Sequence, residues 1–495
     1  MMDELEGSKQ SGTFTVSPGR DLHGELTLAG PKTLLYLRDK NFFSTDFVPD
    51  NCLKGILHDF KKVTLIDCIS PGPGTASYGA ESYHFAAIFP HYVIYGDHHL
   101  GPHEKKITEV DFVIDDATTL FYDFDAFGHV MDAGQFIGPI ISAREKAFNR
   151  QIKTGPASQI LYFAGNLEIF AAETVLGKIS ASHNPSSNLG GPKGVWLKNT
   201  ISMTIAFKEE LAFEDAIIRA STLLRYLGML VGRPQNVLSL SLRIKPDTEG
   251  PGVLQVYWSM APLRDPSKER EKPHPADVLL DAIHEPEQFS RVLGVWLDRQ
   301  QSWHDARARF DSSFAEQRHY DINRLIGSAN MFDILPSSAV PSDLGLTDEL
   351  KAAKDCSRRV FKTLPESPER DSVLNNLGRV GKSNLKHKIR HRAQFLIAGS
   401  TGNRFDDLLL VTDEAVNCRN HYVHGSQPRF DYNRNFDAVA FFIDTLEFVF
   451  AASDLVEAGW DLKAWSAKPT GMSHPFGAYR VSYAPRLGNL KSLLP

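Results

Sequence analysis

The stretch "FDDLLLVTDEAVNCRNHYVHG", residues 405–425, has the apolar spacing of an amphipathic helix and stops at a glycine. An aromatic and polar run follows Gly425, so we expect the helix to end there. Close to this end lie Arg419, Asn420 and His424. A frayed helix end can bring the arginine and the histidine together, and a two-fold dimer can supply converging copies. The stretch therefore combines a helix end with a candidate site.

An arginine followed by a histidine five positions later is a weak motif by itself. The chain has 28 arginines and 18 histidines, so about one such pair is expected by chance. A second pair exists, Arg299 and His304, in a segment whose amphipathic spacing predicts one continuous helix over 288–314. Residues five apart on a helix point about 140° away from each other. We expect only the pair near Gly425 to form a site.

Composition limits the classes of protein to which the chain can belong. With 495 residues, two to four domains are expected. A net charge of −6 argues against a surface coated in basic residues for indiscriminate nucleic-acid binding. The first residues lack the charge pattern of a signal peptide, and no run of about eighteen apolar residues occurs. The four cysteines have no CxxC spacing. A cytoplasmic protein without membrane contact is the expectation.

The pattern of elements predicts an α+β multidomain chain. Residues 12–260 contain short runs rich in Val, Ile, Thr, Phe and Tyr, which are typical of a β-rich sandwich or barrel-like domain, interrupted by one helix over 216–231. Residues 261–277 are charged and hold four prolines, as in a linker. Residues 278–495 have helical spacing, which predicts an all-α bundle, and the first helix is expected over 276–284.

Three glycine- or histidine-rich stretches are not expected to form catalytic or ligand-binding sites. The histidines of "GDHHLGPH", His98, His99 and His103, are expected in a surface turn, because no carboxylate or cysteine stands at a metal-ligand spacing. Residues 187–194 predict a hairpin loop, since they lack the phosphate-loop spacing. Residues 71–82 predict a long flexible loop. We therefore expect no metal ion and no cofactor.

The segment Arg419, Asn420 and His424 followed by glycine resembles the HEPN ribonuclease motif, an arginine, a polar residue and a histidine. The "GELTL" and "VTLIDC" strands and the late "LEFVFAASDLVEAGW" helix are similar to those of ApeA-type antiphage proteins. This resemblance implies a β-rich sensing or regulatory domain joined to a C-terminal HEPN domain. It also implies a homodimer or higher homo-oligomer formed through the HEPN domain. The expected activity is that of an abortive-infection ribonuclease, restrained until a phage signal, such as a phage protein, releases it.

The chemistry of these side chains suits RNA cleavage. RNA supplies the 2′-hydroxyl nucleophile, so the enzyme needs to move protons and to stabilise a charged phosphate. His424 is the expected general base or acid, Arg419 the phosphate ligand, and Asn420 the residue that orients one of them. This reaction needs no metal, leaves a 2′,3′-cyclic phosphate and leaves DNA intact. The expected substrate is tRNA or another cellular RNA.

A basic segment, "KSNLKHKIRHR", is the candidate RNA-binding surface. On a helix its cations would form two adjacent rows suited to a phosphate backbone, although a simple solvated face remains an equal alternative. The candidate residues are Lys382, Lys386, Lys388, Arg390 and Arg392.

One position departs from the resemblance. Related domains often place an acidic residue on an earlier helix, and the matching stretch "NRLIGSANMFD" has Asn330 at that place. Either Asp333 substitutes for this acidic residue or the acidic residue is dispensable.

The rival interpretation belongs to another class: a HEPN-type scaffold that binds nucleotides or partners without catalysis. A metal hydrolase that uses the His98 cluster is a distant third.

Overall fold

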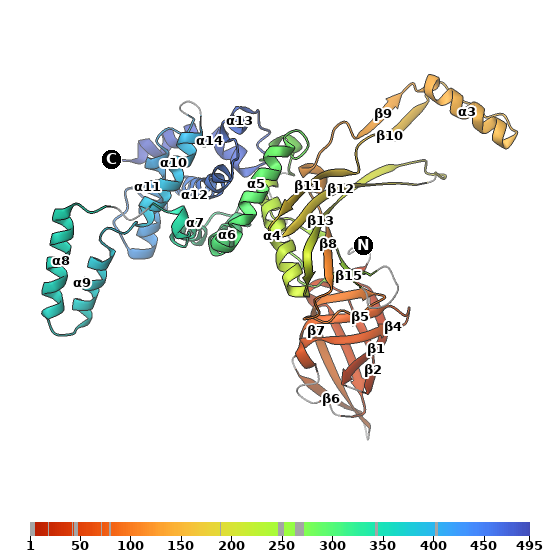
Figure 1. Cartoon of the computed structure of the whole chain (residues 1–495), viewed down its shortest axis with the longest axis horizontal. Helices are drawn as coiled ribbons and strands as arrows, with labels where there is room; N and C mark the ends of the chain where they lie inside the picture. The colour runs from red at the N-terminus through yellow and green to blue at the C-terminus, as the bar shows by residue number, and fades with distance from the viewer. Residues whose placement is uncertain are drawn as a thin grey trace. The chain divides into compact units, whose positions relative to one another are not determined.

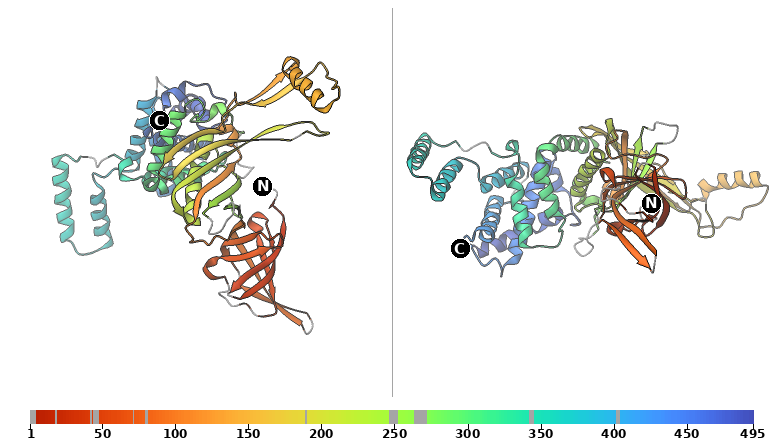
Figure 2. Two further views of the ribbon diagram at one scale, coloured as in Figure 1. Left: turned by 45° about the vertical axis from the view of Figure 1, so that its right-hand side comes forward. Right: turned by 90° about the horizontal axis from the view of Figure 1, so that it is seen from below.

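The computed structural model describes most of the chain (Figures 1 and 2). The described residues are 5–17, 19–41, 43, 48–70, 72–78, 81–188, 190–245, 252–262, 272–341, 345–400 and 404–495. The chain divides into two compact units, one of residues 1–264 with 280–290 and one of residues 265–279 with 291–495. Most of the expected linker at 261–277 lies outside the described residues.

The first unit is rich in strands, as predicted. Among its described residues, a single large sheet has 13 strands, and β9 with β10 forms a separate two-stranded sheet. The elements are β1 (Lys9–Ser17), β2 (Arg20–Thr27), η1 (Gly30–Lys32), β3 (Leu34–Asp39), η2 (Pro49–Asn51), β4 (Leu53–Leu57), β5 (Lys62–Ile69), β6 (Pro73–Tyr78), β7 (Glu81–Gly96), β8 (Ile107–Ile114), α2 (Ala117–Leu120), β9 (Phe127–Met131), α3 (Gly134–Phe148), β10 (Gln159–Phe163), β11 (Glu168–Thr174), β12 (Gly177–Ser187), β13 (Leu197–Leu211), α4 (Phe213–Val231), β14 (Val237–Ile244) and β15 (Val253–Trp258).

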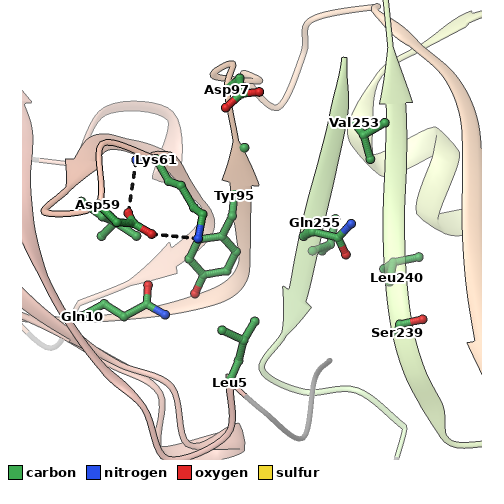
Figure 3. Close-up of a pocket in the computed structure, with 13 residues that line it drawn as sticks. Leu5, Gln10, Asp59, Lys61, Tyr95, Asp97, Ser239, Leu240, Val253 and Gln255 are labelled. Carbon is green, nitrogen blue, oxygen red and sulfur yellow. Dashed lines mark hydrogen bonds and ion pairs between the residues drawn. The ribbon is translucent and has the colours of Figure 1, made fainter. Parts of the chain in front are cut away.

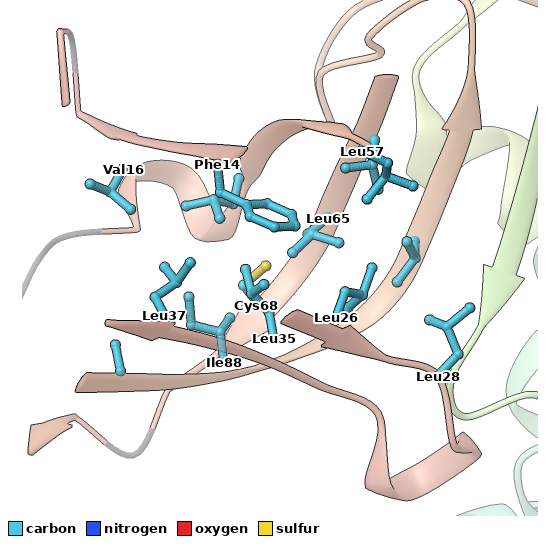
Figure 4. Packing of buried hydrophobic residues seen from close by; sticks show 14 of the residues in the cluster. Phe14, Val16, Leu26, Leu28, Leu35, Leu37, Leu57, Leu65, Cys68 and Ile88 are labelled. Carbon is cyan, nitrogen blue, oxygen red and sulfur yellow. The ribbon is translucent and has the colours of Figure 1, made fainter. Parts of the chain in front are cut away.

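Several strands of the large sheet close into a barrel. The strand order is β7-β3-β2-β1-β4-β5, and β5 pairs again with β7. Inward-facing side chains of alternate residues fill the interior, including Phe14, Leu35, Leu65 and Ile88 (Figure 4). Gly55 on β4 allows a close approach, because a Cβ there would lie 2.6 Å from the Phe14 ring. The barrel-like architecture expected from the strand pattern is confirmed.

The rest of the large sheet stays open and continues from the barrel through the shared strand β7. Its order is β11-β12-β13-β8-β14-β15-β7, and α4 packs against β8 and β13. The predicted helix over 216–231 is confirmed and begins at Phe213. Just after α4, Arg233 makes a buried two-pronged ion pair with Asp116, with both N–O distances at 2.7 Å. This pair holds the end of α4 against the start of α2.

Two loop predictions have different outcomes. Strand β12 ends at Ser187, its antiparallel partner β13 begins at Leu197, and the described residues 188 and 190–194 fall between them, so the hairpin loop is confirmed. The flexible loop expected over 71–82 is wrong for residues 73–78 and 81–82, because β6 pairs with β7 in the register Ala76 to Tyr83. Residues 71, 79 and 80 lie outside the described residues. Cross-strand hydrogen bonds to the neighbouring strand order a segment whose glycines and prolines suggested a loop.

The second unit is helical, as predicted. Its elements are η4 (Pro275–Asp277), α5 (Pro286–Asp298), whose first residues belong to the first unit, α6 (Gln300–Phe314), α7 (Ile322–Asp333), η5 (Ser337–Ala339), α8 (Asp348–Thr363), α9 (Pro368–Arg379), α10 (Leu385–Gly399), α11 (Leu408–His424), α12 (Phe436–Glu457), α13 (Leu462–Ala467) and α14 (Pro475–Leu493). None of the helices in the described segments is both long and apolar enough to span a bilayer.

Helix α12 lies at the centre of the bundle. It packs against α6, α7, α10, α11 and α14, and its side chains are buried over nearly its whole length. Two carboxylates within this helix are buried as well, and each meets an arginine. Glu447 accepts two bonds from Arg324 of α7 at 2.9 and 2.8 Å, and Asp454 accepts two from Arg307 of α6 at 2.9 and 3.1 Å. These pairs fix α6 and α7 against α12.

Two helix predictions are wrong. The helix expected over 276–284 is replaced by the short η4 turn and irregular backbone, because the buried Asp277 carboxylate accepts hydrogen bonds from Thr470, Gly471 and Ser473. The continuous helix expected over 288–314 ends at Asp298 and restarts at Gln300. Arg299, at this break, bonds the Asp454 carbonyl at 2.7 Å. A tertiary contact determines the backbone in both places.

Replacing Arg324 with methionine should lower the free energy of unfolding by about 3–5 kcal/mol, because it leaves the Glu447 carboxylate buried without its cation. Urea denaturation followed by tryptophan fluorescence measures this loss. The control is Arg390→Met, which breaks a partly exposed pair with Asp413 and should cost less than about 1 kcal/mol. Equal losses in both variants would contradict the structural role of the buried pair.

Candidate functional site

The end of α11 carries the predicted site. His424 is the last helical residue, and Gly425 follows in the left-handed conformation with φ 68°. The Gly425 N–H bonds the His421 carbonyl at 2.9 Å, and the His421 ring bonds the Ser426 carbonyl at 2.7 Å. The predicted helix end at Gly425 is confirmed, and the glycine turns the chain directly after the histidine.

Arg419 and His424 contact each other within one chain. The distance from Arg419 Nη1 to His424 Nε2 is 3.0 Å. An arginine N–H only donates, so Nε2 is the acceptor in this contact. Both residues have helical backbone, so the contact requires neither the frayed helix end nor the second protomer suggested by the sequence. The long arginine side chain spans the angle between the two positions.

The other partners of Arg419 are neutral. Nη1 also bonds Asn420 Oδ1 at 3.2 Å, and Nη2 bonds Asn330 Oδ1 of α7 at 3.0 Å. The buried Nε has no partner among the described residues. No carboxylate within the described stretches of the chain makes an ion pair with Arg419, whereas Arg307 and Arg324 each have one. The guanidinium is thus held in place with its charge still available to an anion.

Asn330 lies at the position where the resemblance to HEPN domains suggested an acidic residue. Its amide oxygen accepts a bond from Arg419 and orients it, so a neutral side chain makes the contact that an acidic one was expected to make. Asp333 does not substitute: its carbonyl accepts a 2.7 Å bond from Lys388, and its carboxylate lies 3.8 Å from the same Nζ. The sequence left the role of Asn330 undecided. Its contact with Arg419 involves a different helix, so the Arg-x4-His motif does not reveal it.

The accessible side of the site is formed by His424, which is exposed, and by Asn420, which is half-buried. Cys418, next to the arginine, is fully buried. Burial raises the pKa of its thiol to about 12, so the thiolate is scarce at neutral pH. Cys418 is therefore excluded as a nucleophile, and the reactive groups facing solvent are the imidazole and the guanidinium.

The structure changes the geometry of the candidate RNA-binding segment. Lys382 is exposed and Lys386 is half-buried. Lys388 is engaged with Asp333 as described above, and Arg390 forms a two-pronged ion pair with Asp413 of α11.

Arg392 does not belong to the predicted surface rows. Its side chain is only 1% exposed and bonds Ser453 and Glu457, at 2.9 Å each. It also lies over the Trp303 ring. The helix therefore presents a single solvent-facing row that includes the half-buried Lys386 and the exposed Arg390, because its opposite face packs against α12.

The two alternative clusters do not form sites. Arg299 bonds Glu457 and His304 bonds Asp305, so this second pair does not converge, as expected. Burial lowers the pKa of His99 to about 4, and its Nδ1 lies 3.2 Å from the Thr64 hydroxyl. Within the described residues no group of three or more His, Cys, Asp or Glu side chains is placed to hold a metal ion.

Comparison with known families covers both units. A family model described as "ApeA N-terminal domain 1" matches residues 9–296, and a second, described as "Apea-like HEPN", matches residues 326–464. The second match includes Asn330 and the whole of α11. No curated protein and no solved structure gives a significant match.

Proposed function

Since the chain belongs to the ApeA family, we propose that it is an antiphage defence endoribonuclease whose helical unit cleaves RNA without a metal ion. The family supports a HEPN-type antiphage defence protein, and HEPN domains are commonly ribonucleases. The observation that carries the proposal is the 3.0 Å contact between His424 Nε2 and a guanidinium whose other side-chain partners are the amide oxygens of Asn420 and Asn330.

His424 acts on the nucleophile. Its Nε2 accepts the proton of the ribose 2′-hydroxyl as the oxygen attacks the adjacent phosphorus. The bond from phosphorus to the 5′-oxygen breaks, and the leaving oxygen takes up a proton. The products are a 2′,3′-cyclic phosphate and a 5′-hydroxyl end.

Arg419 binds the phosphate on which negative charge grows. Its planar N–H donors match two phosphate oxygens, and no carboxylate of the described residues neutralises its charge. Asn420 and Asn330 keep the guanidinium oriented, so this stabilisation requires little rearrangement. A homodimer would add a second copy of the motif, whose protonated imidazole could serve as the acid. Light scattering tests the dimer: a monomer that cleaves RNA would remove it from the mechanism.

The β-rich unit is proposed to restrain the enzyme and to receive the phage signal, for which a phage protein is the proposed source. The substrate is proposed to be tRNA or another cellular RNA, because an activity that stops host growth must act on an essential molecule. These roles rest on family membership, and the cleavage assay below includes the arms that test them.

Arg419→Ala and His424→Ala should each lower RNA cleavage in EDTA by about 10²- to 10⁴-fold, because each removes a group that acts on the transition state. The assay compares total cellular RNA, purified tRNA and single-stranded DNA, with and without phage-infected lysate, and analyses the 3′ ends. The matched control is His304→Ala, the exposed histidine of the second Arg-x4-His pair, which should cut like wild type.

Equal cutting by all four proteins would overturn the assigned residues. Intact RNA in every lane, with and without lysate, would favour the alternative, a non-catalytic scaffold that binds nucleotides or partners. Cleavage of DNA would exclude attack by the 2′-hydroxyl.

Asn330 should influence the rate through the orientation of Arg419. Asn330→Leu removes the acceptor and should lower kcat by about 10- to 100-fold with little change in KM. Asn330→Asp keeps an oxygen acceptor but adds a charge that competes with phosphate, so kcat should stay within about threefold while KM rises. Steady-state kinetics on one RNA oligonucleotide separates the two effects. A wild-type kcat in Asn330→Leu would show that the contact has no positioning role.

The half-buried Lys386 of α10 and the exposed Lys382 in the turn before it are the proposed RNA contacts. Lys382 and Lys386 make no ion pair within the described residues, whereas Lys388 and Arg390 would have to leave their carboxylate partners.

In a His424→Ala background, the double variant Lys382→Glu and Lys386→Glu should weaken single-stranded RNA binding and reduce the slope of log K against log salt by about 1–1.5. Fluorescence anisotropy at several salt concentrations gives both values. Lys463→Glu, an exposed lysine on α13, is the control with an unchanged slope. An unchanged slope in the double variant would place the RNA elsewhere.

A further inference from the structure

A cavity of about 370 Å³ lies within the first unit, where the end of the barrel meets the open sheet (Figure 3). One wall comes from β1, the β4–β5 turn and the end of β7, and the other comes from β14 and β15. Leu57, Leu240 and Val256 make much of the lining apolar. The volume is in the range of clefts that hold small molecules.

Two buried polar atoms in this lining lack partners. Tyr95 is only 6% exposed, and its hydroxyl makes no hydrogen bond to the described protein. The Gln10 side-chain oxygen is also buried without a partner among the described residues. Figure 3 shows the Tyr95 ring extending from β7 toward Gln10 and Leu5. Buried polar atoms are nearly always hydrogen-bonded, so two such atoms beside one cavity indicate a missing partner.

The hydroxyl is a permanent donor at physiological pH. Burial, followed by the neighbouring Tyr257, raises the pKa of Tyr95 well above its ordinary value. On the opposite wall, the Ser239 hydroxyl and the Gln255 carboxamide also make no hydrogen bond to the described residues. Gln255 is the register partner of Tyr95 across β15 and β7. The cavity thus offers neutral donors and acceptors between aliphatic surfaces.

The charges at the cavity disfavour anions. Lys61 is the one cation in the described lining, and its Nζ lies 2.8 Å from Asp59 Oδ2. Asp97 adds a carboxylate that makes no ion pair with the described residues. A phosphate group would therefore meet net negative charge and no available cation.

We propose that this cavity binds an uncharged heterocycle of nucleoside size, with an amino group that donates to Gln10 and a ring atom that accepts from Tyr95. The aliphatic side chains of Leu57 and Leu240 suit a flat ring, and paired donors and acceptors on the protein match the alternating edge of a nucleobase. The site is separate from the proposed ribonuclease residues, so its test is independent of that activity.

The test is isothermal titration of the full chain with adenosine, guanosine, cytidine and uridine, each also as its 5′-monophosphate. At least one nucleoside should bind with Kd below about 1 mM, and its monophosphate should bind more weakly. Tyr95→Phe, which removes the hydroxyl alone, should weaken binding about tenfold. Val253→Trp, at a residue 36% exposed at the rim, should abolish binding by filling the cavity without disturbing the core.

The matched control is Tyr162→Phe, on an exposed tyrosine of β10, which should bind like wild type. No heat from any nucleoside at about 10 mM would overturn the proposal, as would unchanged binding in both cavity variants. A monophosphate that binds as tightly as its nucleoside would overturn the exclusion of anions.

Discussion

The packing of the helical unit depends on a carboxylate that is buried in its central helix, α12. Glu447 is buried in α12, and a buried carboxylate is strongly unfavourable unless a cation and hydrogen bonds meet it. Arg324 of α7 meets it with two bonds and also bonds the carbonyls of Gln317 and His319. Burial lowers the pKa of Arg324, but the adjacent Glu447 carboxylate outweighs this and raises the pKa overall. The arginine stays charged, and α7 has one position against α12.

This position of α7 is what completes the site. Asn330 lies on α7, less than two turns after Arg324, and its oxygen reaches Arg419 on α11. Arg307 and Arg324, which hold the bundle together, each meet a buried carboxylate that neutralises their charge inside the fold. Arg419 meets two amides and an imidazole instead. The same residue type therefore serves stability in one place and anion binding in another, and the difference lies in the charge of its partners.

In the first unit, the cavity depends on a strand that the barrel and the open sheet share. Strand β7 belongs to both the closed barrel and the open sheet, so two curved surfaces meet along it and leave a cavity at their junction. The Gln10 and Tyr95 oxygens, which have no hydrogen-bond partner among the described residues, lie at this junction. Each unit thus carries a candidate binding site of its own, and the two differ in chemistry: the helical unit presents an available cation, and the β-rich unit presents neutral groups beside a carboxylate.

The sequence by itself determined what depends on local pattern: the division into a β-rich and a helical region, and the helix end at Gly425. It also singled out Arg419 and His424 as a pair, although the structure brings them together within an intact helix and not through the frayed end or second protomer that the sequence suggested. Periodicity and end signals report such features because they arise from neighbours along the chain. Only the tertiary structure decided which distant groups meet. It buried Arg392 against α12, brought Asn330 to the arginine, replaced a predicted helix with the turn around Asp277, and closed the barrel by pairing β5 with β7. The physical reason is that a buried polar group bonds to the partner that the packing brings next to it. That partner can be far away in the sequence, so residue spacing does not identify it.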